Sequence, residues 1–87
     1  MHKYMLELVE FFKNRINGYA ITDYEEENVI TVLFENDEDK FTVSIDSYNN
    51  SITVDDKKID LSKESLATSI HIVYKTVIDR VNKNILH

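Results

Sequence analysis

Apolar residues recur at helical spacing near the start of the chain, and residues three or four apart lie on one side of a helix. The stripe consists of Met5, Leu8, Val9, Phe12 and Ile16, with Leu6 and Phe11 at its margins. This pattern predicts an amphipathic helix over residues 4–16. Gly18, the single glycine of the chain, follows Asn17 at the position where a left-handed C-terminal cap needs one.

A second helical stripe occupies the last part of the chain. Its members are Leu66, Ile70, Val73, Val77 and Val81, broadened by Ala67, Tyr74 and Ile78. The stripe predicts a helix over residues 63–85 that begins after Ser62 as N-cap, with a hydrophobic staple between Leu61 and Leu66.

The predicted second helix is long compared with the strands of a small domain. At about 1.5 Å per residue it extends for roughly 34 Å, whereas a strand of six residues covers about 20 Å. We therefore expect its far end, with Ile85 and Leu86, to pack on the first helix or on a second subunit.

Between the helices, apolar and polar residues alternate as they do in half-buried strands. The segments with this pattern are residues 19–24, 28–35, 40–46 and 50–55. The second segment is apolar at both parities, which predicts a strand inside the sheet. The short connections favour an antiparallel meander. No register is predicted around residues 55–58, after which Ile59 and Leu61 bring the chain back to the core.

These elements predict an α+β fold for a single domain of residues 1–87. The expected architecture is a two-layer sandwich in α-β-β-β-β-α order, with a four-stranded antiparallel sheet and both helices on one face. The other face is left to water. The residues predicted to point outward from it are Thr42, Ser44, Asp46, Thr53 and Asp55.

The charge of the chain is concentrated in its middle. The formal net charge is −6. Residues 23–60 carry −9, whereas residues 1–22 carry +1 and residues 61–87 carry +2. A protein that binds nucleic acid directly is expected to carry a basic surface. The sequence therefore argues against direct contact with DNA or RNA.

The composition also predicts where the protein works. The chain has no cysteine, so a disulfide framework is excluded and a reducing compartment is favoured. Charged residues interrupt the first apolar stretch, whereas the apolar region of a signal peptide is continuous. The apolar runs are far shorter than the ~20 residues that span a bilayer. We expect a cytoplasmic protein without a membrane partner.

No catalytic or ligand-binding motif is apparent. His71 has no histidine at helical metal-binding spacing, and Ser69, His71 and Asp79 lack a nucleophile elbow. The acidic run of residues 36–40 lacks the central glycine of a calcium loop. We expect no cofactor, no metal site and no enzymatic activity.

Half of the sixteen acidic residues fall in one short tract. Such a tract can keep a protein soluble and protect sheet edges, or it can bind a basic partner. Two tyrosines supply amphipathic anchors for the second interpretation. The candidate partner-binding residues are Asp23, Tyr24, Glu25, Glu26, Glu27, Glu35, Asp37, Glu38, Asp39 and Tyr48.

Small acidic phage proteins that inhibit nucleic-acid machinery, such as anti-CRISPR proteins and glycosylase inhibitors, resemble this chain in size, charge and lack of cysteine. The resemblance is compositional and implies a non-enzymatic inhibitor that occupies a basic nucleic-acid-binding surface of a protein partner. The competing hypothesis is a homo-oligomeric or accessory structural domain that associates through the long last helix. Ile72, which lies off the main stripe, is the apolar residue expected to be exposed there.

Overall fold

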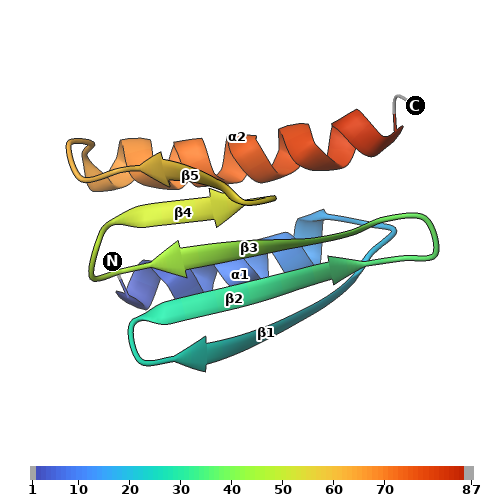
Figure 1. Ribbon diagram of the computed structural model, residues 1–87, viewed down its shortest axis with the longest axis horizontal. Coiled ribbons are helices and arrows are strands. Elements are labelled where there is room, and N and C mark those ends of the chain that lie inside the picture. Colours follow the sequence, from blue (N-terminus) through green and yellow to red (C-terminus); the bar gives the residue numbers. More distant parts are fainter. Residues whose placement is uncertain (1, 86–87) are drawn as a thin grey trace.

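The computed structural model describes residues 2–85, and it describes side chains from Leu6 to Lys83. The chain begins with helix α1 (His2–Arg15), continues through five strands and ends in helix α2 (Leu66–Ile85) (Figure 1). The strands are β1 (Ala20–Glu26), β2 (Val29–Glu35), β3 (Lys40–Asp46), β4 (Ser51–Val54) and β5 (Lys57–Asp60).

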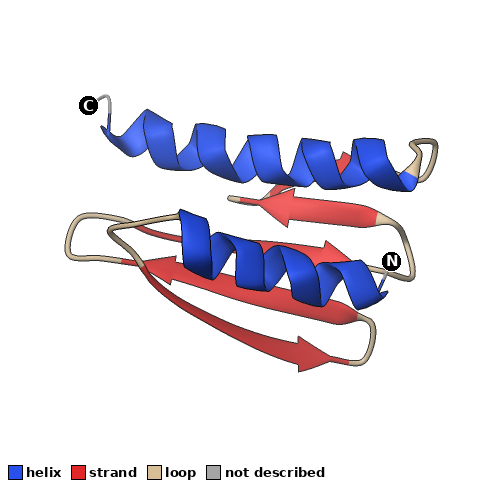
Figure 2. Cartoon of the chain, turned by 180° about the vertical axis from the view of Figure 1, so that it is seen from behind, coloured by secondary structure: helices blue, strands red, loops and turns tan. Residues whose placement is uncertain are grey.

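Each strand pairs antiparallel with the strand before it, so the spatial order is β1-β2-β3-β4-β5. The predicted α+β class and the antiparallel meander are confirmed. The predicted number of strands is wrong, because the sheet has five strands and not four. Both helices lie on the same face of the sheet and run in the same direction (Figure 2). We call this face the inner face and the other the open face.

The strand that the sequence pattern missed is β5, which follows a two-residue turn. Asp55 and Asp56 adopt positive φ angles of 50° and 67°, and Val54 pairs directly with Lys57. Positive φ at both central residues is the geometry that suits the twist of a tight hairpin. Asp tolerates this conformation better than most residues, so the chain makes the turn without glycine.

The core fills the space between the inner face and the two helices. Its buried apolar residues are Leu8, Val9, Phe12 and Ile16 of α1, Ile30, Val32 and Phe34 of β2, Phe41, Val43 and Ile45 of β3, Ile52 and Val54 of β4, Leu61, and Val73, Val77 and Val81 of α2. The alternation along β2 and β3 follows the period of two expected for strands covered on one face. The centre of the core includes an edge contact between Phe12 and Phe34, with 5.9 Å between ring centroids.

The open face carries mostly polar side chains. The register aligns Thr31 of β2 with Ser44 of β3 and Thr53 of β4, in the pairs opposite one another. The predicted outward orientation of Thr42, Ser44, Asp46 and Thr53 is thus confirmed, whereas Asp55 lies in the β4–β5 turn. β2 is an internal strand, as predicted, and its outer residues are half-buried, except for Glu35, which is exposed.

The prediction that Ile72 is exposed is wrong. Ile72 is half-buried and packs against the core, as does Ile59 of β5. The reason is the fifth strand. Ile59 shares a hollow with Thr76, Asp79 and Lys83, the side of α2 that also carries Ile72 at helical spacing.

The start of α2 also differs from the prediction. The helix begins at Leu66, and Ser65 caps it, because the Thr68 backbone N–H donates to Ser65 Oγ at 3.2 Å. Ser62 was predicted as the cap but lies in the turn that leaves β5, where its N–H donates to Asp60 Oδ1 at 2.9 Å. The expected staple does not form around the new cap, and Leu66 is 38% exposed. Buried Leu61 directly follows β5, and its N–H donates to Asn50 O at 2.7 Å.

The helix α1 agrees more closely with its prediction. It ends one residue before the predicted limit, and Gly18 adopts a φ of 87°, so the left-handed backbone expected after the helix is confirmed. Neither helix, within residues 2–85, is long and apolar enough to cross a membrane. The expected packing of Ile85 and Leu86 falls outside the side chains that the structure describes.

Candidate functional site

The meander separates the acidic tract into two groups at opposite ends of the sheet (Figure 1). The β1–β2 and β3–β4 turns share one end, which we call the tyrosine end (residues 24–29 and 46–51). The β2–β3 loop and the β4–β5 turn share the other, which we call the arginine end (residues 35–40 and 54–57, with Arg80). Each end therefore has its own set of carboxylates, and the two sets have different surroundings.

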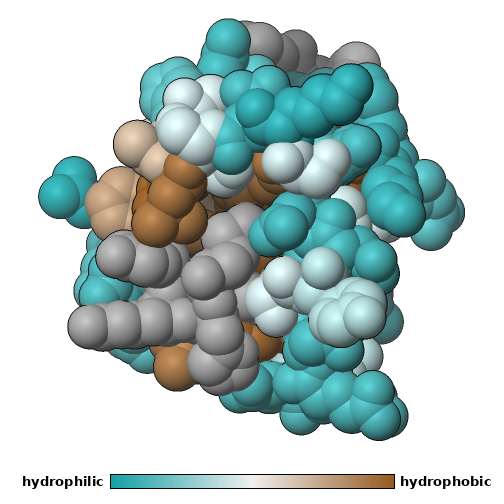
Figure 3. Space-filling view, turned by 90° about the vertical axis from the view of Figure 1, so that its left-hand side faces the viewer, coloured by the Kyte–Doolittle hydropathy of each residue, from teal (hydrophilic) through white to brown (hydrophobic). Residues whose placement is uncertain are grey.

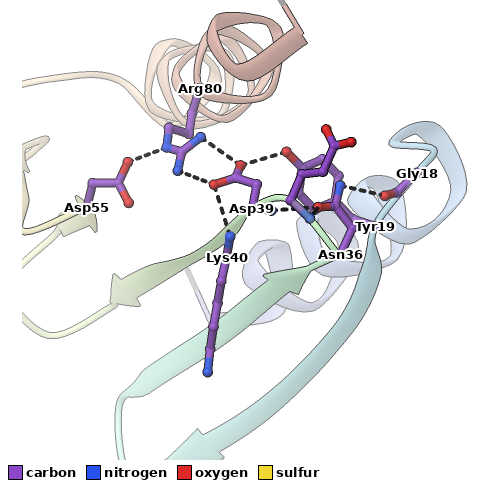
Figure 4. Close-up of polar contacts among 8 residues, drawn as sticks. Gly18, Tyr19, Asn36, Asp39, Lys40, Asp55 and Arg80 are labelled. Carbon is purple, nitrogen blue, oxygen red and sulfur yellow. Dashed lines mark hydrogen bonds and ion pairs between the residues drawn. The ribbon is translucent and has the colours of Figure 1, made fainter. Parts of the chain in front are cut away.

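At the arginine end, Asp39 is joined to α2. The Arg80 guanidinium donates two parallel hydrogen bonds to Asp39, each 2.9 Å long (Figure 4). The Tyr19 hydroxyl and the Lys40 backbone N–H also donate to this carboxylate, at 2.7 and 2.9 Å. The side chains of Asp39 and Arg80 are only 11% and 18% exposed. Charge-assisted, bidentate pairs of this kind are among the stronger hydrogen-bonded contacts in proteins.

Arg80 makes two further contacts that fix its position. Its Nε donates to Asp55 of the β4–β5 turn, and its guanidinium lies 4.4 Å from the centroid of the Phe41 ring. The hydrogen bonds from Arg80 and Tyr19 hold the pKa of Asp39 below its ordinary value. Hydrogen bonding to Asp39 in turn raises the pKa of Arg80. Asp39 therefore has a structural role at the point where α2 meets two turns.

The rest of the β2–β3 loop is organised by Asn36. Its side-chain oxygen accepts hydrogen bonds from the N–H groups of Glu38 and Asp39, at 2.8 and 2.7 Å, and its Nδ2 donates to Gly18 O at 3.0 Å. This is the local hydrogen bonding that makes Asn favourable in turns. Asp37 and Glu38 are exposed, and neither side chain makes a hydrogen bond or ion pair within the described part of the chain.

Asp46 joins the two turns of the tyrosine end. Its carboxylate accepts hydrogen bonds from Asn28 Nδ2 at 2.7 Å and from the N–H groups of Tyr48 and Asn49 at 2.9 and 3.0 Å. These bonds, led by those from Asn49, lower the pKa of Asp46. The Ser47 N–H donates to Asn28 O at 2.9 Å. The turns are thus held together, and they present their outer side chains in a defined arrangement.

Those outer side chains include the two most exposed aromatic rings among the described residues. Tyr24 and Tyr48 are 62% and 81% exposed. Glu26 and Glu27 are exposed beside them, and neither carboxylate has a partner within residues 6–83. The strand period places Tyr24 and Glu26 on the same face, which is the open face.

The register adds an acidic row that the sequence did not predict. Glu26 pairs with Val29, Val29 with Asp46, Asp46 with Ser51 and Ser51 with Asp60. Glu26, Asp46 and Asp60 therefore lie in one line across all five strands, on alternate strands. Neighbouring strands are about 4.8 Å apart, so these carboxylates recur at intervals of roughly 10 Å.

Two other predicted site residues are paired with bases. Asp23 points to the inner face and accepts a hydrogen bond of 2.5 Å from Lys13 of α1, which raises the pKa of Lys13. Glu35 lies 3.7 Å from the Lys40 ammonium at the arginine end. Asp39, described above, is a further carboxylate of the tract with a basic partner. The tract is therefore partly neutralised by the protein's own cations, chiefly at the arginine end and on α1.

Comparison with known proteins assigns no family to this chain, so its function is inferred from the geometry described above. No protein-family model, curated protein or solved structure matches the chain.

The structure does not assemble the residues considered for chemistry. Ser69 is buried, His71 lines a hollow shared with α1, and Asp79 lines a different hollow beside β5. These side chains lie on separate sides of α2. Within the described side chains, no three histidines, aspartates or glutamates come together in a group able to hold a metal ion.

Sequence reasoning missed the pairing of Arg80 with Asp39, although one signal for it exists. Arg80 follows Val73 by seven residues and Val77 by three, so it falls on the buried side of α2. A charged residue in an apolar stripe needs a buried partner. The partner itself depends on the β2–β3 register, which the sequence does not specify.

Proposed function

We propose that this chain is a cytoplasmic, non-enzymatic binding protein whose tyrosine end engages a basic protein partner. Its most concrete form is a phage-type, anti-CRISPR-like (anti-defence) inhibitor that occupies the basic nucleic-acid-binding surface of an effector protein. One observation carries the proposal. Exposed Tyr24 and Tyr48 lie at the same end of the sheet as the unpaired carboxylates of Glu26 and Glu27.

This combination has the chemistry of a protein interface. Tyrosine contributes a large apolar ring and a hydroxyl at low entropic cost, and it is enriched in interface hot spots. The carboxylates supply long-range attraction to a basic surface, which increases the association rate and suppresses acidic partners. The row through Glu26, Asp46 and Asp60 extends this attraction along an edge rather than at one point.

The backbone at Glu27 supports the same surface. Glu27 has a φ of 55° in the β1–β2 turn, a conformation that costs about 1–2 kcal/mol for an ordinary residue and almost nothing for glycine. Strain of this kind is found at sites where a side chain is needed for function. The turn thus carries a carboxylate at a position where glycine would be less strained.

The arginine end offers less to a partner. Its central carboxylate, Asp39, is mostly covered and paired with Arg80, and Glu35 lies beside Lys40. Neutralising residues 37–39 as one group is for this reason a poor test, since loss of Asp39 damages the fold. Asp37 and Glu38 alone remain suitable as a control.

The test compares two variants with equal changes in charge. Immobilised wild type, Glu26→Gln/Glu27→Gln and Asp37→Asn/Glu38→Gln are exposed to a panel of basic nucleic-acid-binding proteins at low and high salt. The proposal predicts capture by wild type at low salt, loss of capture when nucleic acid competes, and loss in the first variant only. Capture by no protein of the panel, or equal capture by all three proteins, contradicts it.

A further inference from the structure

The two helices leave an apolar groove between them on the side away from the sheet. It has a volume of 380 Å³ and is lined by Glu7, Leu8 and Phe11 of α1 and by Ala67, Ile70, His71 and Tyr74 of α2. Phe11 and Tyr74 meet at its floor in an edge contact with 4.8 Å between ring centroids. Figure 3 shows apolar surface at the end of the molecule where both helices begin.

Apolar side chains continue beyond the groove. Leu66 is 38% exposed at the start of α2, and Leu6 is 46% exposed on α1. Leu6 lines a shallower hollow with Glu7, Glu10, Phe11 and Asn14. Contiguous exposed apolar surface on a small domain commonly marks an interaction site.

The helical layer is also the part of the molecule without excess negative charge. α1 carries Lys3, Lys13 and Arg15 against Glu7 and Glu10, and α2 carries Lys75, Arg80 and Lys83 against Asp79. The formal charge of the two helices is therefore +3, whereas the whole chain carries −6. Two copies repel each other strongly at their acidic turns, whereas the charges of the helical layer are mixed in sign and can be arranged so that opposite charges meet.

We propose that the groove is the interface of a homodimer, with a two-fold axis that runs along the groove. Because α1 and α2 run in the same direction (Figure 2), this axis places α1 of one copy against α2 of the other, in parallel. A two-fold axis across the groove instead places α1 against α1 and α2 against α2.

Charge complementarity selects the first arrangement. Glu7, Phe11, His71 and Tyr74 line the same groove, so they lie at the same level along the helices. The axis along the groove brings Glu7 and Glu10 of one copy toward His71 and Lys75 of the other, twice by symmetry. The axis across the groove brings acidic α1 residues together and basic α2 residues together, which is unfavourable.

The helical face is large enough for such a contact. A standard interface buries about 800 Å² on each partner, and the Cα atoms span 34 × 23 × 23 Å, with the helices along one of the larger faces. The dimer leaves both tyrosine ends uncovered and on the same side, because the axis runs parallel to the helices. The proposed homodimer does not depend on the basic partner proposed above, and its tests do not use that partner.

Sedimentation equilibrium over a range of protein concentrations gives the first test. We expect a reversible dimer for wild type and a monomer for Ala67→Glu, which places a charge in the groove. The chain has one other alanine, Ala20, which is exposed on β1, so Ala20→Glu is the matched control and should dimerise normally. A monomeric wild type up to millimolar concentration overturns the proposal.

Exchanging the charges of one proposed intermolecular pair distinguishes loss of the dimer contact from damage to the fold. Lys75→Glu should weaken the dimer at least tenfold, and Lys75→Glu/Glu10→Lys should restore it to within threefold of wild type. Failure of the second substitution to restore association overturns the proposed pairing.

Cysteine cross-linking tests the axis, since the natural chain has no cysteine. A mixture of Glu7→Cys and His71→Cys proteins should form mixed disulfide dimers faster than either protein alone forms its own. Preferential 7–7 cross-links would show the other axis and contradict the arrangement.

Discussion

Arg80 of α2 donates two hydrogen bonds of 2.9 Å to Asp39 of the β2–β3 loop, forty-one positions away in sequence. The contact joins the last helix to the tip of the central hairpin, and Tyr19 and Asp55 complete it from two other connections. One carboxylate of the acidic tract is thus part of the fold. The same contact divides the tract into a structural end and a free end.

Removing this arginine should destabilise the protein strongly. Arg80→Met leaves Asp39 mostly buried without its charged partner, and we expect a loss of about 2–3 kcal/mol in the free energy of unfolding. Lys13→Met breaks the exposed pair with Asp23 and should cost much less. Urea unfolding measures both, and equal losses for the two variants contradict the structural role of Arg80.

The same pair predicts how stability responds to acid. The folded state lowers the pKa of Asp39, so folding is favoured fully above the unfolded pKa of about 3.9. This contribution is lost as the pH falls below that value toward the lower folded pKa, because the unfolded chain binds the proton more readily. Asp39→Asn should show a flatter decline in stability below about pH 4. Parallel curves for wild type and variant would contradict the assignment.

The start of α2 offers a test of the cap. Ser65→Ala removes the oxygen that accepts from the Thr68 N–H, and we expect a loss of about 1 kcal/mol. Ser62→Ala should change stability by a few tenths of a kcal/mol at most, since Ser62 lies outside the helix. A larger loss at Ser62 in thermal or urea unfolding favours the earlier cap that the sequence pattern predicted.

Glycine at position 27 should separate stability from binding. Glu27→Gly relieves the left-handed strain, so the variant should be more stable by up to about 1 kcal/mol. It also removes a free carboxylate from the tyrosine end, so partner capture should weaken. A loss of stability in Glu27→Gly would contradict this prediction, because it would mean that the Glu27 side chain supports the fold.

The sequence pattern was sufficient for the main elements and insufficient for their connections. Periodicity identified both helices and the first four strands. Both helices and β2, β3 and β4 have a buried face, whereas β1 is mostly exposed. It missed β5, because Lys57, Lys58 and Asp60 show little alternation, and the turn before it uses Asp rather than glycine. Ser62 and Ser65 are both good N-cap residues, so the pattern alone does not distinguish them, and the structure has the cap at Ser65.

The candidate surface was predictable in composition but not in arrangement. The counts of acids and tyrosines are visible in the chain, whereas the partners of Asp23, Glu35 and Asp39 depend on which strands and helices meet. The row of Glu26, Asp46 and Asp60 depends on the register of all five strands. Long-range pairings of this type have no local signal.

The most direct test of the account is the salt dependence of binding to a captured basic partner. For wild type, the logarithm of the dissociation constant should rise steeply with the logarithm of salt concentration, because exposed charges are screened within about 10 Å at 0.1 M. Glu26→Gln/Glu27→Gln should reduce that slope and weaken binding, and Asp37→Asn/Glu38→Gln should leave both nearly unchanged. Equal slopes and affinities for the two variants would contradict the assignment of binding to the tyrosine end.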